Sequence, residues 1–272
     1  MSNAKNGIGF IGCGKMAQAI INGIVKSPVA KKFKLSAFDT DQKTLTSACK
    51  KFRIKKEKSN IDVMKNNRII ILAVKPQGMA EALGMVKGAL KPGHLIISIA
   101  AGVSIAKIQA LLEKIVPVVR VMPNTPALVG EGAAGYAFSS QVSAGDKKTA
   151  VQILSTFCRV MENVPEAEIN TVTALSGSGP AYVFYFAEAM LEAANRMGFD
   201  MKKARNLVAQ TFTGAAELFR QSKDSPETLR LNVTSKGGTT ERAVSVMDKN
   251  NIKENFISAV IAAKEKADEL GK

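Results

Sequence analysis

The sequence has little of several features that membrane insertion, secretion or metal binding would require. Its 272 residues include three cysteines and one histidine, and every apolar run falls far short of the roughly 20 residues that span a bilayer. Cys13, Cys49 and Cys158 are scattered, without metal-ligand spacing or a disulfide framework, which is typical of a reduced, cytoplasmic protein. The segment GIGFIG near the N-terminus is too short for a signal peptide. We therefore expect no membrane partner, no secretory signal and no metal site.

Acidic residues are outnumbered by basic ones, 23 against 38, and the formal net charge is +15. Much of this charge lies between Lys26 and Arg68. A nucleic-acid patch and a solvated basic surface are both open interpretations. Aromatic residues are not interleaved with the lysines and no nucleic-acid motif is present, which favours the solvated surface. We expect no nucleic-acid partner, although a basic surface would attract small anionic ligands.

Strand and helix patterns alternate through the first part of the chain. Apolar, β-branched runs occur at 6–14, 34–39, 68–74, 94–99 and 116–121. Helical periodicity separates them at 15–26, 42–51, 77–90 and 104–114, and a last short helix and strand follow over 144–164. Continuous apolar strands between helices are typical of a parallel sheet that is covered on both faces. The pattern therefore predicts an α/β, Rossmann-like N-terminal domain with a mostly parallel sheet, residues 1–164.

From Glu166 onward the sequence has no strand pattern. Helical periodicity runs through 180–197, 201–220 and 252–270, which predicts an all-α C-terminal domain over 165–272. About 100 residues of helix make a thin core, so we expect this domain to pair with that of a second subunit. The segment Ser176–Pro180 interrupts the first helical region and fits either a hinge or a close packing contact between helices, of which we favour the contact.

A dinucleotide-binding pattern stands at the first strand-to-helix junction. Gly12, Gly14 and Ala17 follow the spacing G-x-G-x-x-A. Gly12 permits the tight turn, Gly14 lets a pyrophosphate approach the backbone, and Ala17 allows the helix to pack closely on the strand. The positive end of the helix then faces the phosphates. The junction therefore predicts a dinucleotide cofactor.

Asp39, at the carboxyl end of the second predicted strand, bears on which nicotinamide cofactor is used. A carboxylate there can hydrogen-bond the adenosine ribose hydroxyls and repels a 2′-phosphate, which favours NADH. The lysine-rich neighbourhood could still accommodate the phosphate of NADPH. The sequence slightly favours NADH but is compatible with either nicotinamide cofactor.

A second glycine-containing stretch, Leu231–Val244, reads LNVTSKGGTTERAV. Ser225, Pro226 and Glu227 predict the start of a short helix before it, and an apolar helical pattern resumes at Ala243. A loop of this kind can direct backbone N–H groups and hydroxyls at a small anion such as a carboxylate. An ordinary helix–helix turn would use the same residue types.

Six ordered motifs give the chain a resemblance to pyrroline-5-carboxylate reductases. They are GFIGCGKMA at 9–17, AVKP at 73–76, SIAAG at 98–102, RVMPN at 120–124, GSGPAY at 177–182 and NVTSKGGTTERA at 232–243. The resemblance covers nearly the whole chain. It implies reduction of the cyclic imine Δ1-pyrroline-5-carboxylate to L-proline, the last step of proline synthesis, with NADPH or NADH. It also implies a homodimer through the helical domain, in some members assembled into decamers.

The resemblance also implies roles for individual residues. Thr240 would be the catalytic hydroxyl that hydrogen-bonds the imine nitrogen. The substrate would be bound by Val233, Ser235, Gly237, Gly238 and Thr239. The cofactor would be contacted by Ile11, Gly12, Cys13, Gly14, Lys15, Met16, Asp39, Asn60, Ala73, Val74, Lys75, Pro76, Ile99, Ala100, Ala101, Asn124 and Asn232. Lys236 stands where the family commonly has proline, so the loop is either looser or more positively charged there.

The sequence offers no histidine as a general base, which agrees with this chemistry. His94, the only histidine, lies at the entry end of its strand, away from the edge where such sheets bind ligands, so we expect it to be structural. An iminium is already electrophilic, and positioning with charge complementarity suffices for hydride transfer. A 3-hydroxyacid dehydrogenase and a non-catalytic nucleotide-binding or DNA-binding module are the alternatives. No lysine stands out in the helical domain for the former.

Overall fold

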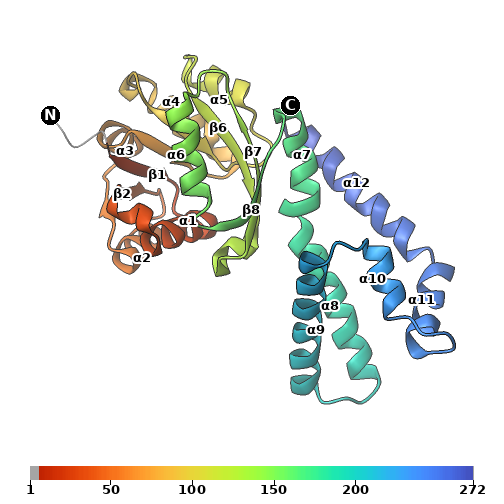
Figure 1. The fold of residues 1–272 in the computed structure, drawn as a ribbon. Coiled ribbons are helices and arrows are strands. Elements are labelled where there is room, and N and C mark those ends of the chain that lie inside the picture. The colour runs from red at the N-terminus through yellow and green to blue at the C-terminus, as the bar shows by residue number, and fades with distance from the viewer. Residues whose placement is uncertain (1–5, 272) are drawn as a thin grey trace. The chain divides into compact units, whose positions relative to one another are not determined.

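The computed structural model describes residues 6–271, which divide into two compact units (Figure 1). The first unit comprises the described residues up to Ser178 together with those from Ala263 onward, and the second comprises Gly179–Ala262. The predicted boundary near Pro165 instead follows the last strand. The division into domains 1–164 and 165–272 therefore stays a prediction.

The first unit is built on a single eight-stranded sheet. Its strands are β1 (Gly7–Ile11), β2 (Lys34–Phe38), β3 (Lys55–Lys56), β4 (Ile69–Leu72), β5 (Leu95–Ser98), β6 (Val118–Pro123), β7 (Gly132–Phe138) and β8 (Cys158–Asn163). Their order across the sheet is β3-β2-β1-β4-β5-β6-β7-β8. Neighbours are parallel except β6 and β7, which are antiparallel. The α/β class with a mostly parallel sheet is thus confirmed.

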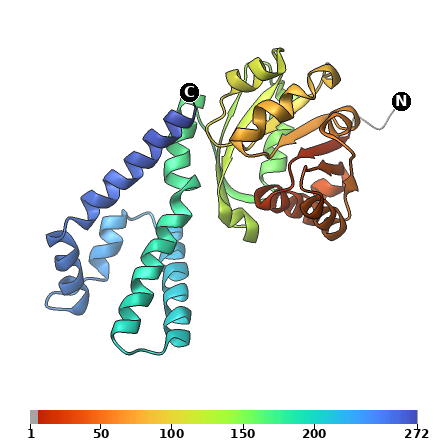
Figure 2. The ribbon, with the colours of Figure 1, turned by 180° about the vertical axis from the view of Figure 1, so that it is seen from behind.

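Helices cover both faces of this sheet (Figure 2). One face packs on α1 (Lys15–Lys26), α2 (Gln42–Phe52) and α6 (Ala144–Leu154). The other packs on α3 (Asn60–Asn66), α4 (Met79–Gly84) and α5 (Ile105–Leu112). Strand β4 shows the alternation: Ile69 and Ile71 join the first core, while Ile70 and Leu72 join the second. The central strands β1, β4 and β5 are buried on both faces, which explains their continuous apolar runs.

Strand β7 was not predicted from the sequence. Five of its seven residues, GAAGYAF, are Gly or Ala, which are poor strand formers, and the segment is extended because it pairs antiparallel with β6. Glycine is required at position 135, since a Cβ there would come within 2.6 Å of Val172 Cγ2 on the short helix α7 (Ile169–Val172). The strand pairing and the close helix contact both join residues far apart in the chain, so no local sequence pattern predicts them.

The predicted helix over 77–90 is shorter than expected. Only α4 is α-helical there, between 3₁₀ turns at Pro76–Gly78 and Lys87–Ala89. Gly84 ends α4 and Gly88 lies in the second turn, so the glycines weaken the helix where the apolar spacing alone would continue it.

The second unit is helical, as predicted. It contains α8 (Gly179–Arg196), α9 (Met201–Gln221), α10 (Pro226–Asn232), α11 (Thr239–Lys249) and most of α12 (Ile252–Leu270). Ser225 caps α10 by accepting a hydrogen bond from Thr228 N, and Pro226 occupies its first turn, which confirms the predicted start. Within this unit Phe256 of α12 lies 5.5 Å from Tyr182 and 5.6 Å from Phe186 of α8, ring centre to ring centre.

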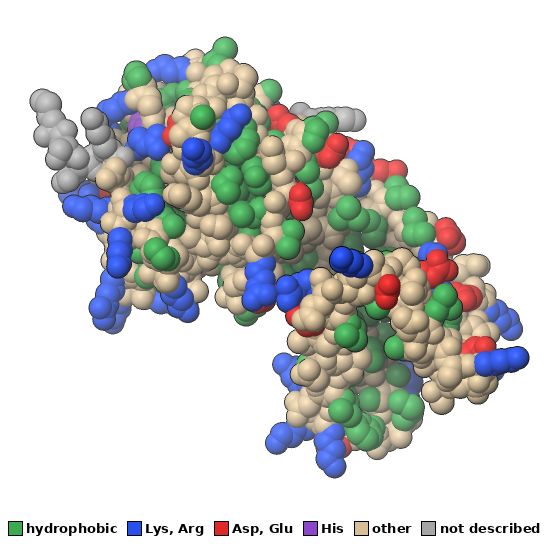
Figure 3. Space-filling model, in the orientation of Figure 1, with side chains coloured by type: hydrophobic (Ala, Val, Ile, Leu, Met, Phe, Trp, Pro, Cys, Tyr) green, Lys and Arg blue, Asp and Glu red, His purple; other side chains and the backbone are tan. Residues whose placement is uncertain are grey.

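Few side chains of the helical unit are buried, whereas many large apolar ones are exposed. Ala194, Ala204 and Val208 are buried, but Phe184, Leu207 and Leu218 are each at least 60% exposed. Figure 3 shows such apolar side chains on one face of this unit. A surface of this kind is typical of an interface with another copy. Among residues 6–271, no helix is long and apolar enough to cross a membrane.

Candidate active site

The first glycine loop, Gly12–Gly14, joins β1 to α1. Gly12 has φ of 99°, and a Cβ on it would come within 2.7 Å of the Ala73 carbonyl oxygen on the neighbouring chain segment. Only glycine fits both conditions. Gly14 is the N-cap of α1 and has no side chain to occupy the first amides of the helix, and the space around its Cα is open. The loop can therefore hold a phosphate against the positive end of α1.

Asp39 follows β2 and is fixed by this loop. Its Oδ2 accepts a hydrogen bond of 2.6 Å from Cys13 N, and its Oδ1 accepts one of 2.9 Å from Asp41 N. Each carboxylate oxygen keeps a lone pair for a further donor. Burial, with smaller contributions from Asp39 and Cys49, raises the pKa of the Cys13 thiol to about 12. The loop therefore carries no thiolate that would repel a phosphate at neutral pH.

Two cavities lie along the carboxyl edge of the sheet. The first, of about 520 Å³, follows β1, β2 and β4 and is lined by predicted cofactor residues and by further ones. The predicted ones are Gly12, Gly14, Asp39, Asn60, Ala73, Val74 and Lys75. The others include Thr40, Asp41 and Thr44, which were not predicted as cofactor contacts although Thr40 and Asp41 directly follow Asp39.

The second cavity, of about 390 Å³, lies at the ends of β4, β5 and β6. Its predicted residues are Gly14, Lys15, Met16, Ala73, Val74, Lys75, Pro76, Ile99, Ala100, Ala101 and Asn124. Met122, Pro123, Thr125 and Gly177 also line it and were not predicted as cofactor contacts. The two cavities share Gly14 and the segment 73–75.

This pair of cavities has the layout that a dinucleotide requires. The strand order places β1 and β4 side by side at the point where the chain reverses direction across the sheet. In such sheets the adenosine half lies beside the acidic residue after the second strand and the other half lies beyond the reversal. The first cavity therefore fits adenosine and the second fits the nicotinamide half. The residues fit a nicotinamide dinucleotide.

Three predicted cofactor residues line neither cavity. The side chains of Ile11 and Cys13 are fully buried in the core, so only their backbone can face a ligand. Asn232 is the last residue of α10 in the helical unit and is exposed.

The second glycine loop, Ser235–Gly238, is a tight turn before α11. Gly238 N donates to Ser235 O at 3.0 Å, and a Cβ on Gly238 would come within 2.6 Å of Ser235 Oγ. Gly237 adopts φ of 73° and donates its N–H to Glu241 Oε2 at 2.7 Å. The Gly237 amide is thus oriented so that it binds a carboxylate, here the protein's own. Sequence reasoning did not single out Glu241.

Helix α11 begins earlier than the apolar pattern suggested. Its first residue is Thr239, not Ala243, because Gly238 serves as N-cap. Thr239 and Thr240 therefore lie in the first turn, where helix N–H groups lack intrahelical partners. Lys236 is exposed beside them, so its charge adds to the positive end of the helix.

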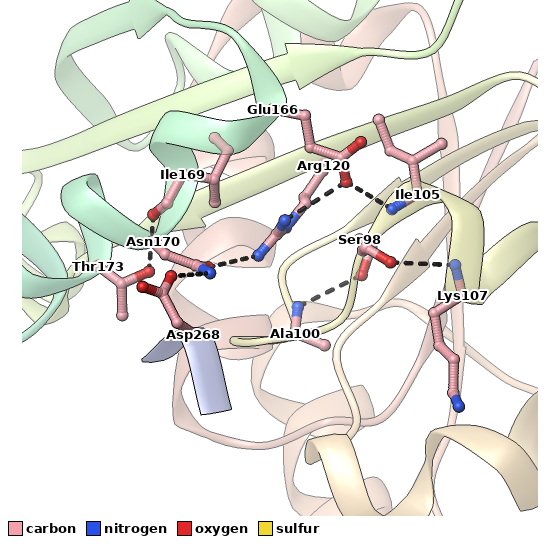
Figure 4. A network of polar contacts seen from close by, with 11 residues as sticks. Ser98, Ala100, Ile105, Lys107, Arg120, Glu166, Ile169, Asn170, Thr173 and Asp268 are labelled. Atoms are coloured by element: carbon pink, nitrogen blue, oxygen red, sulfur yellow. Dashed lines mark hydrogen bonds and ion pairs between the residues drawn. The ribbon is translucent and has the colours of Figure 1, made fainter. Parts of the chain in front are cut away.

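A polar network stabilises the end of β6 that leads into the second cavity (Figure 4). Arg120, which is 5% exposed, donates to Glu166 Oε1 at 3.3 Å and to Asn170 Oδ1 at 2.9 Å. Glu166 also accepts from Ile105 N at 2.6 Å, and Asn170 donates to Asp268 Oδ1 at 2.8 Å. Burial lowers the pKa of Arg120 while Glu166 opposes the shift. The network holds β6, whose last residues Met122 and Pro123 line the second cavity.

The chain is similar to known proteins over its whole length. Residues 166–270 match the family model described as pyrroline-5-carboxylate reductase dimerisation, and residues 7–102 match NADP oxidoreductase coenzyme F420-dependent. Pyrroline-5-carboxylate reductase from Methanosarcina acetivorans is 38% identical over 100% of both chains. The enzyme from Pseudomonas aeruginosa is 38% identical over 97% of this chain and 96% of its own. The NADP-bound crystal structure of Plasmodium falciparum pyrroline carboxylate reductase superposes with a TM-score of 0.86, at 32% identity, over 98% of this chain and 100% of its own.

Proposed function

The chain belongs to the pyrroline-5-carboxylate reductase family, and we propose that it reduces Δ1-pyrroline-5-carboxylate to L-proline by hydride transfer from NADPH or NADH. The observation in the fold that carries this proposal is the pair of cavities that meet at Gly14 and the segment 73–75. They supply an elongated cofactor site at the edge of the sheet where such folds bind ligands.

We assign the cofactor to the residues that line these cavities. Gly12, Gly14 and the amides of α1 would hold the pyrophosphate, and Asp39 would accept hydrogen bonds from the adenosine ribose. Ile99–Ala101 and Asn124 would border the nicotinamide. The small side chains of Ala100 and Ala101 leave room for a planar ring. When bound, the cofactor supplies the hydride with its two electrons.

We assign the substrate carboxylate to the second glycine loop and the imine nitrogen to Thr240. The first turn of α11, whose N–H groups lack intrahelical partners, and the charge of Lys236 support the first assignment. A substrate carboxylate would take the place of Glu241 at the Gly237 amide. The proton on the imine nitrogen comes from water, since an iminium forms readily in solution. A hydride from the bound cofactor would add to the ring carbon of the C=N bond, and the nitrogen would keep its proton as the amine of proline. Thr240 has only to hold the nitrogen in place.

Steady-state kinetics would test this function directly. We expect the purified protein to oxidise NADPH or NADH only when Δ1-pyrroline-5-carboxylate is present, with formation of L-proline in equal amount. Hydroxyisobutyrate with NAD serves as the control for the dehydrogenase alternative and should give no turnover. Absence of oxidation of both cofactors with the imine would reject the proposed reaction.

The chain self-associates through its helical domain, as the matched dimerisation model indicates. We propose in addition that dimers assemble into decamers. The exposed apolar side chains of α8 and α9, among them Phe184, Leu207 and Phe219, support contact between copies, and the mass of the assembly distinguishes dimer from decamer. Light scattering coupled to size exclusion should give ten times the mass of one chain at micromolar concentration. A mass of two chains would reject the decamer and retain the dimer.

A further inference from the structure

One wall of the second cavity is formed by a π-helical turn that the proposed mechanism leaves without a role. The turn spans Thr173–Gly177 and is closed by a hydrogen bond of 2.8 Å from Ser178 N to Thr173 O. A π turn is rare and holds one more residue than an α turn. Gly177, at its end, lines the second cavity together with Met122.

Gly177 and Met122 are in close contact across this wall. A Cβ on Gly177 would overlap Met122 Cε, whereas the next nearest side-chain atom outside Met122, Thr173 Cγ2, would be at an ordinary 3.7 Å. The backbone of Gly177 is not in the left-handed region, so alanine would suit its φ. The only obstacle to a side chain at 177 is therefore Met122. A methionine end is flexible, and Met122 itself lines the cavity.

The residue before Gly177 reaches the same cavity through Asn124. Asn124 Nδ2 donates to Ser176 Oγ at 3.2 Å, and Asn124 Oδ1 accepts from Ala133 N at 2.9 Å. These two bonds fix the carboxamide and leave one hydrogen of Nδ2 for another acceptor. The π turn thus places Ser176 against Asn124, a polar residue of the cavity wall, and Gly177 against Met122, an apolar one.

We propose that the π turn Thr173–Gly177 sets the width of the nicotinamide half of the site, with Gly177 as the positioning residue. Because Gly177 lacks a side chain, the thioether end of Met122 packs against the turn and stays out of the space for the planar ring. A thioether beside an aromatic ring is also a favourable contact. This inference rests on the proposed function, since it takes the second cavity as the nicotinamide site.

The first test compares two glycines of the same SGSGP segment. Gly177→Ala should raise the Kd for NADPH and NADH about tenfold, as overpacking of a close contact does, because Met122 is pushed into the ring space. Gly179→Ala is the matched control, since a Cβ there meets nothing within 4 Å and the residue lines neither cavity. It should leave Kd unchanged. Cofactor binding is read by fluorescence, and unfolding temperatures are recorded for both variants.

The second test removes the side chain that Gly177 is proposed to accommodate. In the Met122→Ala background, Gly177→Ala should change cofactor Kd by less than about twofold, because no clash remains. A tenfold loss in both backgrounds, or no loss in either, would overturn the role of Gly177. If Gly177→Ala alone does not fold, a double variant that folds and binds cofactor like Met122→Ala identifies Met122 as the group displaced and supports the role of Gly177. A double variant that also fails to fold overturns it. Failure of the unaltered protein to bind either cofactor would instead reject the proposed function.

Discussion

Replacing Thr240 by valine is expected to lower kcat with Δ1-pyrroline-5-carboxylate about 10²-fold and to leave the Kd for NADPH and NADH unchanged. Valine keeps the branched shape of threonine and removes only the hydroxyl that would hold the imine nitrogen. The loss of one positioned hydrogen-bonding group in an active site typically has an effect of this size. Thr240 lies in the first turn of α11 and not at its N-cap, so the helix itself should persist.

Thr240→Ser is the matched control, because serine keeps a hydroxyl at the same position. It should retain most of the rate. Single-turnover kinetics with saturating cofactor separate hydride transfer from product release. A Thr240→Val variant with an unaltered rate of hydride transfer would remove Thr240 from the catalytic role, whereas equal losses in both variants would point to a packing effect and not to the hydroxyl.

Features that depend on neighbouring residues were predictable from the sequence. The turn at Gly12–Gly14, the parallel sheet and the helical second half all follow from local spacing, and each is present in the fold. The capped start of α10 at Ser225 is another example, since an N-cap, a proline and an acid are adjacent in the chain. Such signals suffice to place the cofactor edge because parallel strands end at one side of the sheet.

Features that depend on distant residues were not predictable. Strand β7 is extended only because β6 pairs with it. The segment Ser176–Pro180 favoured a close packing contact over a hinge but did not identify the partner, which is Met122 against Gly177, far apart in the chain. The contact between the Gly237 amide and Glu241 was missed for another reason: it is local, but an acid in the first turn suggests only a favourable charge at a helix start.

Replacing Asp39 by serine is expected to shift the ratio of kcat/KM for NADPH to that for NADH by about 10- to 100-fold in favour of NADPH. The substitution changes this ratio through two effects, and both favour NADPH. The substitution removes a carboxylate that would accept hydrogen bonds from the adenosine ribose of NADH, and it removes a negative charge that would repel the 2′-phosphate of NADPH. Asp39 lines the first cavity, where Asp41 adds a second carboxylate.

Asp41→Ser separates these two effects. Asp41 caps α2 by accepting from Lys43 N and Thr44 N, and serine can keep that cap. This variant removes one charge from the same cavity without touching Cys13 N, which Asp39 holds. If repulsion of the phosphate dominates, both variants should improve kcat/KM for NADPH alike. If Asp39 binds the ribose, only Asp39→Ser should also lose kcat/KM for NADH. Equal cofactor ratios before and after Asp39→Ser would mean that Asp39 serves only to position the first glycine loop through Cys13.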